Sequence, residues 1–335
     1  MRSLTIFIPG LFGSGIAFPD DLPNAPALNW FLKKGFTKLR KLNSFSYALC
    51  DLFGLKQNGL NDLPIASISR LIDSDQYPDG VWVRVDPVHV STNGNRLKLS
   101  DSSQFNITQH DALEYAAVIN GLLESYNLQL EVPSPFRWYI KLNEGMELST
   151  TPIDSVIGQD ILPHMPKKSN NINIEQLIND IQMSLHDVEI NFKREKEKKL
   201  PINSVWFWGC GKLPSIIDRT WSSVYGDEVI SEGLSIVSAT PFKKLPEKFD
   251  EIEDINSNFS NLFVIGEFDR FRNYHNFDEW VEMLVRYEIN WFSPLSDALE
   301  RKNIDQLIIE TDINSIYISK YSRYYFWRDQ KSFIS

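Results

Sequence analysis

Short runs of apolar residues, separated by segments with helical spacing, most constrain the fold of this 335-residue chain. Each run is too short for a buried helix and is rich in β-branched or aromatic residues, which predicts strands buried on both faces. The clearest runs are LTIFI (4–8), VWFW (205–208), NLFVIGEF (261–268) and IDQLIIET (304–311). Strands that alternate with helices at this spacing predict a mixed, mostly parallel α/β sheet.

Apolar residues at helical spacing predict the elements between these strands. The segment 26–35 begins with Pro26 and ends with Gly35, the usual punctuation of a short helix. Further helices are expected at 46–55, 109–125, 174–185, 215–225 and 277–301. Additional strands are expected at 79–91, 136–142 and 233–239, with a hairpin or edge pair at 316–328.

Size and charge narrow the classes of function. At 335 residues the chain exceeds the usual single domain, so two lobes are expected. A net charge of −10 repels nucleic-acid phosphates and anionic lipid, so neither nucleic acid nor membrane is an expected partner.

The cysteines and the N-terminus indicate the compartment. The chain has only two cysteines, Cys50 and Cys210, and they lie far apart in the sequence, which fits a reducing compartment. The apolar N-terminus is broken by Pro9-Gly10, which predicts a first strand rather than a signal peptide. We therefore expect a soluble, cytoplasmic protein.

The segment GCGK (209–212) is expected to form a flexible turn after a buried strand, the position where ligands bind in α/β sheets. The pattern Gly209-x-Gly211 lacks the third glycine of a dinucleotide site and the lysine pattern of a P-loop. Cys210 is a candidate nucleophile, although a small residue at such a position more often only fills the turn. The five histidines show no metal-binding spacing, and no G-x-S-x-G motif occurs.

Several blocks resemble the RpfE-type regulatory proteins, bacterial proteins similar to cofactor-independent (2,3-bisphosphoglycerate-independent) phosphoglycerate mutases. The specific block is NDIQMSLHDVEINFKREKEKKLPINSVWFWGCGKLP (179–214). VRVDPVHVS (83–91), RWYIKL (137–142) and YYFWR (324–328) also match, so the resemblance spans nearly the whole chain. The segments LTIFIPGLFGS, APALNWFLKKG, SYALCDLFGL and WFWGCGKLPSIIDRTWSSVYG further resemble archaeal-type phosphoglycerate mutases of the alkaline phosphatase superfamily.

This resemblance implies an α/β fold with a mostly parallel central sheet flanked by helices, alkaline phosphatase-like, and a smaller inserted α+β lobe. The implied core comprises 1–80 and 175–335, and the lobe 81–174. The superfamily uses two metal ions, held by carboxylates and histidines, around a phosphorylated Ser or Thr. Pro9 stands where the first metal-binding Asp is expected, and ETDINSIY (310–317) lacks the late histidine. Ser44 and Ser46 mark the vestigial nucleophile region, and Asp269 is the surviving candidate ligand.

A retained binding pocket would be built from strand-end loops and from the 179–214 block. The candidate ligand-binding residues are Asp86, His89, Gln182, His186, Asn191, Asn203, Gly209, Cys210, Gly211, Lys212 and Asp269. Lys212 could hold an anion as a flexible ammonium donor. For Gln182, His186 and Asn191 a structural network or cap is the simpler alternative.

The primary hypothesis is a degenerate phosphoglycerate mutase-like protein that lacks the dinuclear metal site and acts by binding or regulation. It implies no cofactor, and an unknown small phosphorylated metabolite or a protein as partner. The alternative is an active cofactor-independent phosphoglycerate mutase or metal-dependent phosphatase, which would require Mn²⁺ or Zn²⁺. A third hypothesis is a metal-free enzyme that uses Cys210 or the neighbourhood of Asp86 and His89.

Overall fold

The computed structural model describes residues 2–13, 25–39, 44–56, 62–146, 148–167, 173–252, 260–272 and 277–324. The chain divides into two compact units. Unit 1 comprises Met1–Ala48 and Asp218–Ser335, and unit 2 comprises Leu49–Ile217. The expected boundaries at 80/81 and 174/175 both fall inside unit 2. The structure places them there because the helices around residues 65–73 and 174–186 pack on the same sheet as the segment between them.

A seven-stranded sheet forms the centre of unit 1 within the described residues, in the order β2-β12-β11-β1-β10-β8-β9. Strand β1 (Ser3–Phe7) pairs in parallel with β10 (Ser260–Val264) and β11 (Gln306–Glu310). Strands β8 (Ser223–Gly226) and β9 (Phe242–Lys244) extend the parallel part. Strands β12 (Asn314–Ser319) and β2 (Phe36–Leu39) close the other edge with antiparallel pairs. The carboxyl ends of the parallel strands therefore lie along one edge of the sheet.

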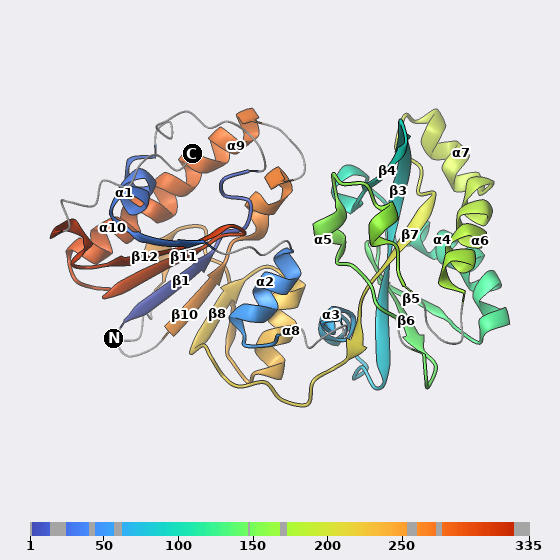
Figure 1. The fold of residues 1–335 in the computed structure, drawn as a ribbon, viewed down its shortest axis with the longest axis horizontal. Helices are drawn as coiled ribbons and strands as arrows, with labels where there is room; N and C mark the ends of the chain where they lie inside the picture. The colour runs from blue at the N-terminus through green and yellow to red at the C-terminus, as the bar shows by residue number, and fades with distance from the viewer. Residues whose placement is uncertain are drawn as a thin grey trace. The chain divides into compact units, whose positions relative to one another are not determined.

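Helices cover both faces of this sheet. Figure 1 shows α1 (Pro26–Lys34), α9 (Phe277–Tyr287) and α10 (Ser293–Glu300) on one side and α8 (Val229–Val237) on the other. A π-helical turn, η6 (Glu288–Phe292), joins α9 to α10. The core on the α1 side combines Leu28, Phe31, Trp280 and Leu295 with Ile6 of β1. This packing explains the apolar faces of the helices at 26–35 and 277–301.

Two predicted elements of unit 1 are wrong. Residues 229–237 form α8 instead of a strand, because Ile230, Leu234 and Val237 are buried at helical spacing. Residues 215–225 form no helix but lead into β8, where Val224 pairs with Leu262 of β10. Of the expected edge pair at 316–328, β12 is antiparallel to β11, and residues 325–328 lie outside the described residues.

Unit 2 contains an antiparallel sheet of five strands among the described residues. The long strand β3 (Val81–Asn93) pairs with β6 (Arg137–Leu142), β7 (Ser204–Lys212) and β4 (Arg96–Ser100). Strand β5 (Leu130–Ser134) pairs with β6. The VWFW segment is thus a strand buried on both faces, as predicted, but it belongs to this antiparallel sheet rather than to the parallel one.

Side chains alternate between the two faces of the unit 2 sheet. Val83, Val85, Trp138, Ile140 and Phe207 point into an apolar core. Helices α4 (Gln109–Leu123), α6 (Ile174–His186) and α7 (Glu189–Lys196) complete this core. The opposite face carries aromatic and charged side chains and receives α3 (Ile65–Asp73). Two further helices of the described chain are α2 (Phe45–Leu52) and α5 (Ile153–Val156).

Among the described residues, no helix combines the length and the apolar character that crossing a membrane requires.

Candidate functional site

The GCG segment is part of strand β7, not a loop that follows it. Gly209 has a φ of +65° and lies at a bulge, where the register of β3 and β7 shifts between Trp82 and Arg84. A positive φ of this size favours glycine. Gly211 still pairs with Trp82, and Lys212 pairs with Val81. The predicted flexible turn is therefore wrong, because the strand passes through it.

Both glycines are required by helix α3, which packs directly on them. A Cβ on Gly209 would lie 2.8 Å from Cβ of Ile65, and one on Gly211 would lie 2.7 Å from Cβ of Pro64. The Ser67 hydroxyl donates to the Gly211 carbonyl at 2.6 Å. The close approach that the glycines allow is thus taken by the start of a helix. The space beside Gly209 and Gly211 is therefore filled by Ile65 and Pro64.

Cys210 is buried in the core of unit 2, where it packs with residues such as Phe207. A reactive cysteine needs an electropositive and partly exposed environment. The position of Cys210 therefore argues against the nucleophile that the sequence suggested.

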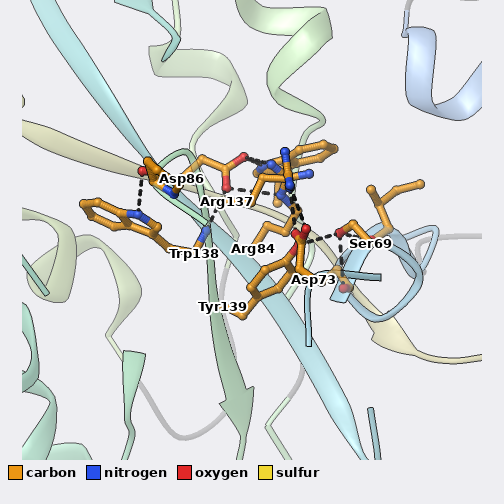
Figure 2. Close-up of polar contacts among 11 residues, drawn as sticks. Ser69, Asp73, Arg84, Asp86, Arg137, Trp138 and Tyr139 are labelled. Atoms are coloured by element: carbon orange, nitrogen blue, oxygen red, sulfur yellow. Dashed lines mark hydrogen bonds and ion pairs between the residues drawn. The ribbon is translucent and has the colours of Figure 1, made fainter. Parts of the chain in front are cut away.

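A buried ion pair occupies the α3 side of the unit 2 sheet (Figure 2). Arg84 donates to Asp86 through Nε at 3.1 Å and Nη2 at 2.6 Å. The same carboxylate accepts from the Trp208 indole at 2.8 Å and from the Trp138 backbone N–H at 3.3 Å. Burial raises the pKa of Asp86, whereas Arg84 and the Trp208 indole oppose that rise. With four donors on one carboxylate, Asp86 is occupied by the protein's own groups.

A second pair fastens α3 to strand β6. Arg137 contacts both carboxylate oxygens of Asp73, at 2.7 and 2.6 Å. The Tyr139 hydroxyl donates to Asp73 at 2.6 Å and lies 3.0 Å from the Ser69 hydroxyl. Figure 2 shows these side chains converging between the helix and the sheet. Because every polar group here has a partner in the protein, the cluster is a structural network that positions α3.

The remaining candidates of unit 2 make internal contacts. His89 Nδ1 lies 2.8 Å from the Pro201 carbonyl, and Gln182 donates to the Ser204 hydroxyl. Asn203 bonds both the N–H and the carbonyl of Val90. Buried Asn191 bonds Tyr115, Leu185 and Ile202. The structural alternative considered for Gln182 and Asn191 accounts for these contacts.

His186 lies at the exposed end of α6, with Nδ1 2.8 Å from Asp187. The Asp187 carboxylate raises the pKa of His186. His186 and Asp187 are neighbours in sequence at the exposed end of the helix, so this contact does not place His186 in a pocket.

Lys212 is the candidate that lines a cavity. It borders a hollow of about 850 Å³ at the end of the unit 2 sheet, together with Trp82, Lys141 and Glu131. Glu131 is held by Arg70, whose guanidinium lies 3.8 Å from the Trp82 ring centroid. Lys141 lies 3.8 Å from Asp79. Lys212 thus borders this hollow, and its contact with an anion stays a prediction.

Asp62 is a partner of Cys210 that the sequence did not indicate. Its carboxylate accepts from the backbone N–H of Thr150 at 2.9 Å, from the Thr150 hydroxyl, and from the backbone of Cys210. Burial raises the pKa of Asp62 from 3.8 to about 6. The carboxyl thus ties strand β7 to the segment before α5.

This raised pKa predicts a pH dependence of stability. Because the folded state binds the proton more tightly, the free energy of unfolding should fall as the pH rises from 3.8 to about 6. Allowing for partial exposure, the loss should be about 2 kcal/mol. Urea unfolding at several pH values should show this loss in the native chain and not in Asp62→Asn. A difference between the two proteins that stays constant across the window would contradict the assignment.

The carboxyl ends of β1, β10 and β11 meet in unit 1 at a strand-end junction, formed by Pro9, Gly10, Phe268, Asp269 and Asp312. Gly10 has a φ of +75°, and a Cβ there would lie 2.2 Å from the Phe268 carbonyl oxygen and 3.0 Å from Cα of Asp269. Its backbone N–H donates to the Asp312 carboxylate at 3.0 Å. The turn that follows β1 therefore contacts the backbone of Asp269, which follows β10, and the carboxylate of Asp312, which follows β11.

Asp312 is the residue of this junction that sequence reasoning missed. Asp269 lies in the helical turn η5 (Gly266–Arg272) after β10, as expected, whereas Asp312 was not among the expected ligands. The signal for Asp312 was its place two residues after β11, within the segment ETDINSIY that lacks the expected histidine. Ile313 follows it, so the position after the carboxylate is apolar.

Ser44 and Ser46 begin helix α2. The Ser44 hydroxyl accepts from the Tyr47 backbone N–H at 3.1 Å, so Ser44 acts as the N-cap of the helix. Phe45 stacks on Phe7 of β1, with ring centroids 5.5 Å apart. Both serines are buried. The vestigial nucleophile region thus has a structural use at the start of α2.

The described residues do not fit the dinuclear metal site that the sequence resemblance implies. They contain no group of three or more His, Cys, Asp or Glu side chains arranged to hold a metal ion. Pro9 has no side-chain ligand atom, and Asp312 accepts a hydrogen bond from Gly10. The described histidines, His89, His110, His164 and His186, all belong to unit 2, and His275 lies outside the described residues. The junction therefore offers two carboxylates where several ligands are needed.

Comparison with known proteins supports a relation to phosphoglycerate mutases in sequence. A probable 2,3-bisphosphoglycerate-independent phosphoglycerate mutase of Geobacter sulfurreducens is 28% identical over 135 residues, which cover 40% of this chain and 34% of that protein. The corresponding enzyme of Methanosarcina mazei is 33% identical over 84 residues, 25% of this chain and 21% of that protein. The chain thus spans about a third or less of the length of these relatives. No protein-family model matches it.

The fold was also compared with solved structures. The PH0037 protein of Pyrococcus horikoshii has a TM-score of 0.50 at 12% identity, and the match covers 95% of this chain and 87% of that chain. The cofactor-independent phosphoglycerate mutase of Thermoplasma acidophilum has a TM-score of 0.48 at 14% identity, covering 95% and 90%. At such identities a structural match concerns the fold alone. The chain has the expected mixed α/β fold, and part of it is similar in sequence to cofactor-independent phosphoglycerate mutases.

Proposed function

We propose that this protein is a degenerate relative of the cofactor-independent phosphoglycerate mutases that acts by binding and regulation. The observation that carries the proposal is the strand-end junction. There Pro9 follows β1, Ile313 follows Asp312, and the Asp312 carboxylate holds the backbone of Gly10. One carboxylate that holds a backbone N–H does not replace the several converging ligands that phosphoryl transfer through paired metals needs.

The regulatory role rests on the resemblance of residues 179–214 to the RpfE-type proteins. In the folded chain this block forms α6, α7 and β7 and packs into the core of unit 2. Lys212, at the end of β7, is the cation of this block that borders a hollow. The proposed ligand is a small phosphorylated metabolite or a protein partner, and no cofactor is required.

A metal and turnover assay tests the proposal on the full chain purified without chelators. We expect mass spectrometry to find no stoichiometric Mn²⁺ or Zn²⁺, and neither ion to raise the melting temperature. We also expect no conversion of 3-phosphoglycerate with either metal, whereas the Geobacter relative, assayed in parallel, should turn over. Titration of 3-phosphoglycerate by calorimetry with a chelator present tests binding without chemistry, with Lys212→Met as the variant.

The alternative function is a metal-dependent mutase, favoured by the sequence similarity and by Asp269 and Asp312 flanking Gly10. The variant Asp312→Asn separates the two functions, because asparagine can still accept the Gly10 hydrogen bond. Under our proposal this variant folds and binds Mn²⁺ no differently from the native chain. Two tightly bound metal ions, lost together with turnover in Asp312→Asn, would establish the mutase instead.

A further inference from the structure

A second cavity lies in unit 1, away from the carboxylates that flank Gly10. Its volume is about 360 Å³, within the size of small-molecule sites. Three adjacent parallel strands end at it: β8 is followed by Asp227, β9 ends at Lys244, and β10 leads to Glu267 in η5. The crevice outside the carboxyl ends of parallel strands is where α/β sheets bind ligands.

The opposite wall of this β8–β10 cavity is fixed by the π-helical turn η6. The Trp291 indole donates to the Glu247 carbonyl at 3.2 Å, which holds the segment after β9. In the same turn, Glu288 accepts from the backbone N–H groups of Ala27 at 2.7 Å and Leu28 at 3.1 Å. These contacts anchor η6 to α1, so the cavity wall is in place before any ligand binds. π-helical turns occur frequently at functional sites.

The charged residues that line the cavity comprise one ion pair and three residues that form no ion pair with other described residues. Arg286 pairs with Glu267, which also accepts from the Tyr287 hydroxyl at 3.2 Å. Asp227, Lys244 and Glu247 form no ion pair with other described residues, and all three are exposed. One ammonium group therefore faces the same cavity as two carboxylates.

We propose that the β8–β10 cavity binds a small zwitterionic metabolite of the amino-acid class. Lys244 pairs with the ligand's carboxylate, and Asp227 and Glu247 pair with its ammonium group. The ligand's side chain lies against Leu245 and Trp291. A phosphorylated anion would meet two carboxylates with one ammonium group available, so its charge does not fit. This inference goes beyond the proposed function and does not depend on it.

Calorimetry on the full chain tests the inference with three probes: L-arginine, L-glutamate and 3-phosphoglycerate. L-arginine should bind best, since its additional guanidinium suits the excess of carboxylates, and 3-phosphoglycerate should not bind at the cavity. The double variant Asp227→Asn/Glu247→Gln should weaken L-arginine binding at least about tenfold, the loss of one charge-assisted contact. The control Glu300→Gln removes an exposed carboxylate of α10 outside the cavity and should leave the affinity unchanged.

A site-specific signal accompanies the affinity. The indole N–H resonance of Trp291 should shift in the ¹⁵N spectrum when L-arginine is added, and the double variant should not show the shift. Because the substituted side chains are exposed, the variants should melt at the native temperature. The inference is overturned if none of the probes binds, or if L-arginine binds the double variant as tightly as the native chain. Binding of 3-phosphoglycerate that is lost in Lys244→Met would also overturn it.

Discussion

The Asp86→Ala variant is expected to lose about 4 kcal/mol of its free energy of unfolding, the usual cost of breaking a buried ion pair. Arg84 and Asp86 are 7% and 4% exposed, so the substitution leaves a guanidinium charge without water and without its partner. The Trp208 indole also loses its acceptor. Urea unfolding followed by tryptophan fluorescence measures the change, since Trp82, Trp138, Trp206 and Trp208 all belong to unit 2.

An exposed ion pair supplies the matched control for Asp86. Lys193 and Glu189 lie one helical turn apart in α7 with Nζ–Oε1 at 3.1 Å, but their side chains are 61% and 83% exposed. Glu189→Ala should therefore cost less than about 1 kcal/mol. Equal losses in the two variants would show that burial does not make the Arg84–Asp86 pair different.

The Gly10→Ala variant should lose about 3 kcal/mol, by two effects that act together. The left-handed backbone disfavours any Cβ, and the new methyl group would lie 2.2 Å from the Phe268 carbonyl oxygen. The backbone after β10 would have to move, which would displace Asp269 and strain the hydrogen bond from Gly10 to Asp312. Thermal and urea unfolding measure the loss.

Gly54 separates the two effects. It has nearly the same φ, +77° against +75°, but nothing lies within 4 Å of its added Cβ. Gly54→Ala should therefore show only the backbone cost, about 1 kcal/mol. If both alanine variants lose the same free energy, the close packing of the strand-end junction contributes nothing to stability.

Local sequence patterns predicted the elements in which the residues at the ends and the spacing of the apolar residues indicate the same structure. Pro26 and Gly35 bound α1 because proline fits the first turn and the residue after the helix is extended. The segment VISEGLSIV shows where such patterns fail. Its β-branched residues favour a strand, but burial of Ile230, Leu234 and Val237 against the sheet makes it α8. Packing outweighed propensity there.

The sequence predicted a feature of the candidate site only where the type of a single residue determines that feature. Pro9 cannot supply a side-chain metal ligand in any fold, and that conclusion needed no structure. Asp312 could be evaluated only once β11 and β1 were seen to lie side by side, because its partner is a backbone group 302 residues away. The β8–β10 cavity likewise combines loops from three strands and one helical turn, which no local pattern connects.

By itself the sequence determined the class of fold, the burial of its strands and the lack of a side-chain ligand at position 9, because these depend on residue type and short-range spacing. The tertiary structure decided what lies against Gly209 and Gly211: they make room for Pro64 and Ile65 of the α3 segment. A glycine reports only that a backbone must come close or turn left-handed. What comes close is fixed by long-range packing, which no single segment of the chain contains.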